Sequence, residues 1–233
     1  MTDIRLDKFI SNNTLLSRSD SRKAIFTGRV KVNGQVVSKI DFKIDTCVDD
    51  VILDGQPIQY EKYVYLIMNK PKGILSATRD NKMKTALDLL PEIYKKRNIF
   101  PAGRLDKDST GMLLLTDDGD FAHKITCPKH HIEKSYIVEL DGDITNEVIE
   151  GFKSGVVLYD GEKCASCVCE RISDTTARVI LTEGKYHQIK RMFGVYDLGV
   201  NSLHRERIGN FTLPNDLKEG QFIKINPQIL TKN

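Results

Sequence analysis

The sequence of 233 residues has no run of about 18 apolar residues, the length that a membrane-spanning helix needs. Its beginning, MTDIRLDKFI, lacks the apolar stretch of a secretory signal peptide. No internal repeat and no low-complexity segment is present. Hydrophobic residues make up 40% and charged residues 29%, proportions that are ordinary for a soluble globular protein. We therefore expect a cytoplasmic protein with no membrane partner.

Cysteine is scarce and is not arranged as in a zinc site. Three of the five cysteines, Cys164, Cys167 and Cys169, are close together. A closed zinc site needs four ligands at a recognised spacing, and no second CxxC or HxxxH pair follows. We expect these cysteines to be reduced, small apolar side chains in a strand-like segment, and we expect no metal.

The chain also lacks a large net charge, which is only +3. The distribution is more informative. Residues 1–40 hold eight Lys and Arg against three Asp and Glu, whereas residues 41–60 hold one against five. This asymmetry predicts a small unit with one positive face, which favours a polyanionic partner. An ordinary solvated charged surface is the alternative interpretation.

The first 60 residues predict a compact unit of two helices and a hairpin. Apolar residues recur at helical spacing over 6–10, and Ser17 and Gly28 are typical of the start and end of a second helix. Residues 30–37 alternate apolar side chains around an Asn-Gly pair, which indicates a β-hairpin. Residues 51–58 have the pattern of a further strand and turn.

The segments RLDKFIS and SRSDSRKAIFTGRVKVNG resemble an S4 domain, the small RNA-binding module of ribosomal protein S4. This resemblance implies that RNA phosphates bind against the basic second helix and its surroundings. We expect an S4-like RNA-binding domain over residues 1–60 and a catalytic domain over residues 61–233. The candidate RNA-binding residues of the S4-like domain are Arg18, Arg22, Lys23 and Arg29.

The second part predicts an α+β fold with a mixed, largely antiparallel sheet, because strands outnumber helices and do not alternate regularly with them. Residues 69–73, NKPKG, contain Pro and Gly together and are predicted to form a turn. A further turn is predicted at Asp117-Asp118-Gly119. The other predicted elements are strands at 63–68, 134–140 and 176–182, and helices at 85–93 and 184–196.

The segment GRLDKDSTG, residues 103–111, contains the most promising polar residues. A phosphate-binding P-loop is excluded, because no Gly-Lys-Ser/Thr sequence is present. Asp106 and Asp108 fit the DxDxT pattern of haloacid dehalogenase-type phosphatases, in which the first Asp is the nucleophile. That alternative requires a doubly wound parallel sheet, and the residues before Asp106 make a poor strand.

GRLDKDSTG is also similar to the signature of the pseudouridine synthases of the RsuA branch, in which the aspartate of RLD is catalytic. NKPKG at 69–73, EKSYIVEL at 133–140 and GKYHQIKRMF at 184–193 fit the same family in the same order. The resemblance implies isomerisation of a uridine to pseudouridine. This reaction needs neither a redox cofactor nor a metal, so we expect no cofactor.

The resemblance also implies site roles. Asp106 is the expected nucleophile, on C1′ of the sugar or on C6 of the uracil. Because burial disfavours a charged carboxylate, a nearby cation is needed, and the family pattern assigns Lys190. Tyr136 is expected to pack against the target base, Ile189 to lie under the uracil, and Arg104 to approach the stack that the flipped uridine leaves.

Three further cations are expected to contact the RNA, namely Lys70 and Lys72 on its backbone and Arg191 on a phosphate. His187 is expected to make a structural hydrogen bond. The resulting hypothesis is a monomeric pseudouridine synthase that acts on small-subunit ribosomal RNA or on a subunit assembly intermediate. Alternatives are a large-subunit RNA substrate and a non-catalytic S4-type assembly factor.

Overall fold

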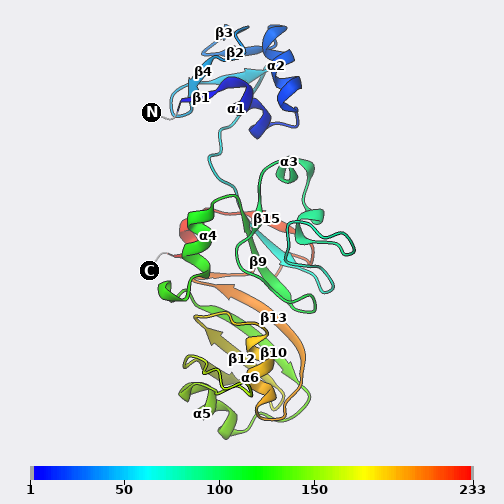
Figure 1. Cartoon of the computed structure of the whole chain (residues 1–233), viewed down its shortest axis with the longest axis vertical. Helices are drawn as coiled ribbons and strands as arrows, with labels where there is room; N and C mark the ends of the chain where they lie inside the picture. The colour runs from blue at the N-terminus through cyan, green and yellow to red at the C-terminus, as the bar shows by residue number, and fades with distance from the viewer. Residues whose placement is uncertain (1–2, 232–233) are drawn as a thin grey trace. The chain divides into compact units, whose positions relative to one another are not determined.

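The computed structural model describes residues 3–231, which form two compact units (Figure 1). The first unit comprises the chain up to Tyr63 together with Leu90–Asn98, and the second comprises Val64–Leu89 and the chain from Ile99 onward. Within residues 3–231, none of the helices is both long and apolar enough to span a membrane.

Two short helices of the first unit confirm the predicted pair. Helix α1 is Leu6–Asn13 and helix α2 is Arg18–Phe26. The hydroxyl of Ser17 caps α2 by accepting a hydrogen bond from the backbone N–H of Asp20, as the sequence predicted. The apolar faces of both helices pack on the strands of the same unit around Phe9 and Ile25.

The strands of the first unit form two small sheets. The predicted hairpin consists of β2 (Val30–Val32) and β3 (Gln35–Val36), joined by Asn33 and Gly34 at φ 50° and 81°. Positive φ at both positions is what a type I′ turn requires, so the Asn-Gly prediction is confirmed. The remaining strands are β1 (Asp3–Arg5), β4 (Lys43–Asp45), β5 (Val51–Leu53) and β6 (Gln56–Pro57).

Leu90–Asn98 belongs to the first unit although the second unit flanks it on both sides in the sequence. It contains the one-turn helix α3 (Glu92–Lys95). The guanidinium of Arg97 donates hydrogen bonds to the carbonyls of Glu61 and Lys62 at 3.1 and 3.0 Å, and the ammonium of Lys96 donates to the carbonyl of Leu15. These bonds attach the segment to the first unit.

The second unit is built on one mixed sheet. Its neighbouring strands pair antiparallel, except that β13 and β9 pair in parallel. The predicted α+β fold with a largely antiparallel sheet is confirmed. Strand β8 (Phe100–Pro101) adds to β9, and β14 (Phe211–Thr212) adds to β13. The other strands, in sheet order, are β11 (Val168–Arg171), β12 (Thr176–Leu181), β10 (Lys134–Leu140), β13 (Val200–Ile208), β9 (Thr110–Thr116), β7 (Tyr65–Lys70) and β15 (Phe222–Lys224).

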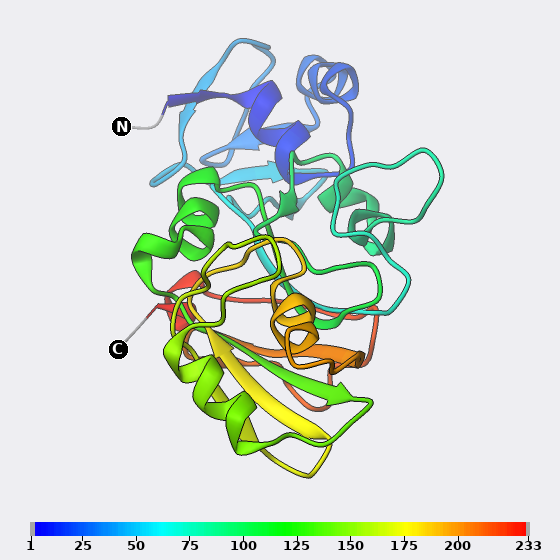
Figure 2. The same ribbon diagram turned by 60° about the horizontal axis from the view of Figure 1, so that its bottom comes forward.

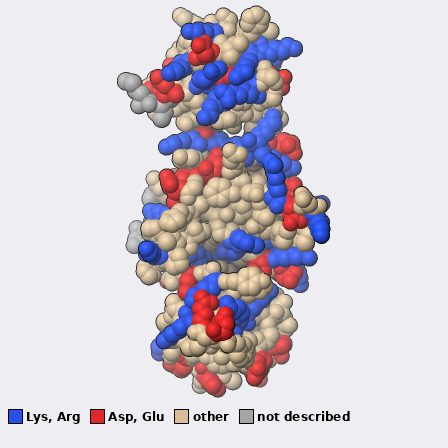
Figure 3. All heavy atoms as spheres, viewed as in Figure 1, with Lys and Arg blue, Asp and Glu red and all other residues tan. Residues whose placement is uncertain are grey.

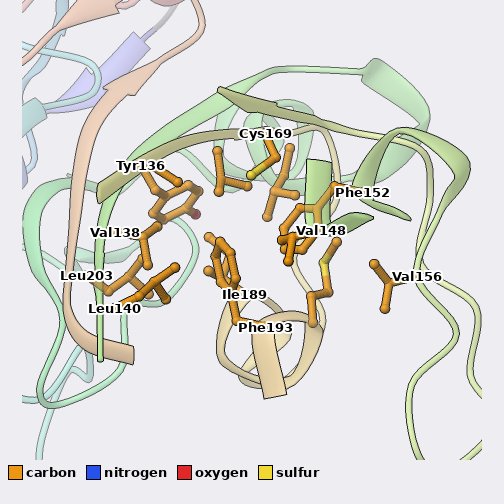
Figure 4. Close-up of a cluster of buried hydrophobic side chains, with 14 of the residues drawn as sticks. Tyr136, Val138, Leu140, Val148, Phe152, Val156, Cys169, Ile189, Phe193 and Leu203 are labelled. Carbon is orange, nitrogen blue, oxygen red and sulfur yellow. The ribbon is translucent and has the colours of Figure 1, made fainter. Parts of the chain in front are cut away.

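Helices cover this sheet over two separate apolar cores (Figure 2). Helix α4 (Gly119–Thr126) packs on β7 and β9. Helices α5 (Asn146–Ser154) and α6 (Gln188–Gly194) pack on β10 and β12, and Figure 4 shows side chains of this second core. Three 3-10 turns complete the unit, at Ala86–Leu89, Pro128–His130 and Pro227–Leu230.

Some predicted boundaries are wrong. Strand β7 continues through Lys70, which pairs in register with Gly111, so the turn begins only at Pro71. The predicted helix at 85–93 is a 3-10 turn, because the carboxylate of Asp88 accepts from the N–H and hydroxyl of Thr85 and Pro91 then interrupts it.

Helix α6 begins at Gln188, later than predicted, and residues 184–187 are a loop. Helices α4 and α5 were not predicted. Their N-caps are Asp118 and Thr145, whose side chains accept from Phe121 and Val148. Asp118 therefore starts a helix at a place where the sequence pattern predicts only a turn.

Candidate active site

Asp106 lies in the loop between β8 and β9, and this loop is held from both sides. Buried Leu105 exchanges two hydrogen bonds with the hydroxyl of Ser76, through its carbonyl at 2.9 Å and its N–H at 3.1 Å. At the other end, Gly111 packs against the backbone of Arg205 so closely that a Cβ would lie 2.4 Å from its carbonyl oxygen. The loop therefore has little freedom on either side of Asp106.

Lys70 lies beneath this loop and is fully buried. Its ammonium donates hydrogen bonds to the carbonyls of Ser109 at 2.7 Å, Pro71 at 3.1 Å and Lys107 at 3.2 Å. Burial lowers the pKa of Lys70 to about 8. The expectation that Lys70 contacts the RNA backbone is wrong, because its side chain is fully buried and its ammonium donates its hydrogen bonds to carbonyls of the loop. Lys72 is exposed, and its role stays a prediction.

The carboxylate of Asp106 lies between the side chains of Lys190 and His187. Lys190 Nζ lies 3.8 Å from Asp106 Oδ2, and His187 Nε2 lies 3.4 Å from Asp106 Oδ1. His187 has φ 48° just before α6, and its ring stacks on that of Tyr186 at 3.9 Å between centroids. The turn before α6 and the helix itself thus present both groups to one carboxylate.

A small hollow of about 80 Å³ opens beside this carboxylate. It is lined by Tyr136 from β10, Ile189 from α6 and Leu203 from β13, together with Asp106. Figure 4 shows Tyr136, Ile189 and Leu203 as part of one apolar cluster. Tyr136 is 8% exposed and Ile189 is 4% exposed, so each presents only an edge to the hollow.

Arg205 also belongs to the site, although no sequence motif pointed to it. It is 4% exposed and lies opposite Tyr136 in the register of β10 and β13. Its Nε donates to the carbonyl of Met112 at 2.7 Å, its Nη1 lies 3.4 Å from the hydroxyl of Tyr136, and its Cζ is 5.9 Å from that ring's centroid. The sequence did contain one signal for Arg205. It stands two positions after the apolar residue Leu203 in a strand, so both side chains lie on the same, buried face.

Comparison with known proteins identifies this architecture. The family model for RNA pseudouridylate synthase matches residues 64–194, and the S4 domain model matches residues 4–52. The chain belongs to the RNA pseudouridine synthase family. The DxDxT phosphatase hypothesis is therefore wrong, as the largely antiparallel sheet also indicates.

Relatives of this pseudouridine synthase cover nearly its whole length. It is 40% identical over 221 residues to ribosomal small subunit pseudouridine synthase A of Escherichia coli (strain K12), covering 94% of this chain and 95% of the relative. It is 38% identical over 226 residues to an RNA pseudouridine synthase of Aquifex aeolicus (strain VF5), covering 97% and 94%. A crystal structure of pseudouridylate synthase matches with a TM-score of 0.69 at 34% identity, and the match covers 97% of this chain and 98% of the chain in that structure.

The other cations singled out from the synthase sequence differ in their surroundings. Arg104 is exposed and lines the hollow beside Asp106. Arg191 forms ion pairs with Asp160 and with Glu162, the latter at 3.4 Å. No contact in the described residues brings Arg191 to Asp106, and its phosphate role stays a prediction.

In the S4 domain of this synthase, Asp7 organises the basic cluster. Its carboxylate is fully buried and pairs with Arg22 at 2.9 Å, Arg5 at 3.1 Å and Arg18 at 3.4 Å. Burial alone would raise the pKa of Asp7, but the hydrogen bonds from Arg22, Arg5 and Arg18 outweigh it and hold this pKa at about 2. Arg18 and Arg22 remain about half exposed, at 51% and 48%.

Lysine and arginine side chains gather on one face of this first unit, as Figure 3 shows. Lys23 is exposed on α2. Arg29 pairs with Asp54. The contacts with Asp7 and Asp54 hold three of the four predicted RNA-binding side chains in fixed orientations, and their binding of RNA stays a prediction.

In the part of the chain that the structure describes, no three His, Cys, Asp or Glu side chains lie close enough together to hold a metal ion. Burial raises the pKa of Cys167 to about 12 and that of Cys169 to about 11. These thiols are therefore protonated at neutral pH and pack as apolar side chains.

Proposed function

We propose that this enzyme converts a uridine of small-subunit ribosomal RNA to pseudouridine, with Asp106 as the nucleophile. The observation that carries the chemistry is the position of the Asp106 carboxylate against Lys190 at the edge of an apolar hollow. The choice of small-subunit RNA rests on the 40% identity to an enzyme named ribosomal small subunit pseudouridine synthase A. Large-subunit RNA is the alternative.

The reaction breaks the bond between uracil N1 and sugar C1′, turns the uracil, and joins C5 to C1′. The proton leaves C5, N1 gains one, and no oxidation state changes overall. Asp106 attacks either C1′ or C6, and each route needs an ionised carboxylate. The ammonium of Lys190 lies 3.8 Å from that carboxylate and is complementary to it in charge.

The hollow beside Asp106 holds the uracil after it has left the RNA stack. Tyr136 packs against the base and Ile189 lies beneath it. Extrusion of a stacked base costs a few kcal/mol. Arg104, exposed beside the nucleophile, offsets part of this cost by approaching the vacated stack.

The two parts of the chain divide the work. Residues 1–60 dock on RNA through the cluster of Arg18, Arg22, Lys23 and Arg29, and residues 61–233 carry the chemistry. The enzyme acts as a monomer on ribosomal RNA or on a subunit assembly intermediate. The isomerisation itself requires neither a metal nor a redox cofactor.

The test is to map pseudouridines in both ribosomal RNAs from cells with and without this protein. We expect one small-subunit position to lose its pseudouridine and to regain it when the wild-type protein is restored. Loss only in large-subunit RNA would replace the small-subunit assignment with the alternative. Unchanged maps of both RNAs would overturn the ribosomal substrate.

A further inference from the structure

Two hollows meet over Asp106 and Tyr136, and only one is used by the proposed reaction. The smaller hollow contains Ile189 and receives the uracil. The larger has a volume of about 650 Å³ and is lined by Asp106 and Tyr136 as well, but not by Ile189. A uracil alone leaves this larger space without an occupant.

Two buried cations line the larger hollow. Lys134 is 8% exposed and Arg205 is 4% exposed, and they come from the adjacent strands β10 and β13. Lys134 lies two residues before Tyr136, so both side chains are on the same side of β10. The structure therefore places two positive charges on the wall that Tyr136 forms.

Neither cation is neutralised by protein. Among residues 3–231, no carboxylate forms an ion pair with Lys134 or Arg205, although Asp80, Asp106 and Glu183 line the same hollow. The Nη2 atom of Arg205 is buried and has no hydrogen-bond partner within the described chain. Buried charges and buried N–H groups without partners are costly, and most such groups in proteins are satisfied.

The ionisation of Lys134 is consistent with this picture. Burial, together with the charge of Arg205, lowers the pKa of Lys134 to about 8. An anion between the two cations would offset the repulsion between Lys134 and Arg205 and would favour the charged form of Lys134. The hollow is thus best matched to a negatively charged ligand.

Resting on the proposed function, we propose that Lys134 and Arg205 bind a backbone phosphate next to the target uridine, and that the larger hollow holds the flanking nucleotide. RNA brings such a phosphate wherever it brings a uridine. Arginine is well suited to phosphate because its N–H groups match two phosphate oxygens. Lys107 is exposed and lines the same hollow, so it adds a further positive charge near the proposed phosphate.

The test titrates small-subunit ribosomal RNA into the full-length protein at several salt concentrations and compares Lys134→Met with Lys134→Arg. The matched control is Lys153→Met, because Lys153 is exposed on α5 and lines neither hollow. We expect Lys134→Met to weaken binding about tenfold, which corresponds to about 1.4 kcal/mol, because the phosphate loses a charged hydrogen-bond donor. The log–log salt slope should fall by about 0.7, the value for one single-strand phosphate.

Lys134→Arg should keep both the affinity and the slope, because it keeps the charge. An unchanged slope in Lys134→Met, or an equal fall in Lys153→Met, would overturn the phosphate site. Arg205→Lys provides a second variant that keeps the buried charge but removes Nη2, and it should weaken binding without changing the slope; full wild-type affinity would contradict the role of Arg205.

Single-turnover isomerisation of the same RNA separates this inference from the proposed function. If the RNA is bound with the expected slopes but the wild-type protein isomerises none of it, the proposed substrate fails and the phosphate site stands. If isomerisation is normal and the slopes are equal in all variants, the phosphate site alone fails.

Discussion

The Nζ atom of Lys190 lies 3.8 Å from the Oδ2 atom of Asp106, joining helix α6 to the loop between β8 and β9. The two side chains are 31% and 29% exposed, so the pair is partly desolvated but still reachable by a ligand. The ion pair thus places the carboxylate that we propose as the nucleophile at the edge of the apolar hollow.

Replacing Lys190 should therefore lower the reaction rate more than RNA binding. We expect Lys190→Met to reduce the single-turnover rate about 100-fold, in the range found when one charge-stabilising group is removed from an active site. Lys190→Arg keeps the charge and should retain most of the rate. A Lys190→Met protein that reacts within twofold of wild type would show that the ion pair has no catalytic part.

Lys70 should matter for stability rather than for RNA contact. Lys70→Met leaves the carbonyls of Pro71, Lys107 and Ser109 without their donor, and an unsatisfied buried group costs about 1–3 kcal/mol. Urea unfolding should show a loss of this size. Lys72→Met, at an exposed position of the same turn, should be close to wild type. Equal stability of the two variants would contradict the buried role.

The contribution of Lys70 should also depend on pH in a defined direction. Its pKa is about 8 in the folded state, below the ordinary value of 10.5, so the unfolded chain binds more protons between these values. Wild-type stability should then rise with pH relative to Lys70→Met, by at most about 1.4 kcal/mol per pH unit. Urea unfolding of both proteins at pH 8 and pH 10 measures the difference in their free energies of unfolding. A difference that becomes smaller at pH 10 would contradict the lowered pKa of Lys70.

The cysteines should differ sharply in reactivity. Cys47 is exposed, whereas Cys164 and Cys169 are buried and burial raises the pKa of Cys167 to about 12. At pH 8 a thiol reagent should modify Cys47 of the native protein rapidly and the clustered thiols slowly. Cys47→Ser should remove the fast phase. Rapid modification of Cys167 in the native protein, or its acceleration by a chelator, would contradict this account of the cluster.

Much of the fold was predictable where the determinants are local. The cap at Ser17 and the Asn33-Gly34 turn depend on residues within a few positions of each other, and the structure has both. The predicted turn at Asn69 and Lys70 was wrong because the Pro and Gly that follow them end a strand without deciding its last residues. Strand length here depends on pairing with β9, which is distant in the sequence.

The candidate site was predictable only in part for the same reason. Ordered motifs pointed to Asp106, Tyr136 and Lys190, and the structure brings all three to the same hollow. Arg205 lies in no such motif, and it enters the site only because β10 and β13 pair in a register that local pattern does not reveal. The caps of α4 and α5 were present in the sequence, so those two helices could have been found.

The most direct measurement of the central claim is single-turnover formation of pseudouridine by Asp106→Asn on the RNA that the wild-type protein modifies. The amide keeps the shape of the side chain but is not a nucleophile, so turnover should be lost while thermal unfolding and RNA affinity stay near wild type. Asp108→Asn, at an exposed position of the same loop, is the matched control and should keep substantial activity. Pseudouridine formation by Asp106→Asn at a rate close to wild type would contradict the assignment of Asp106 as the nucleophile.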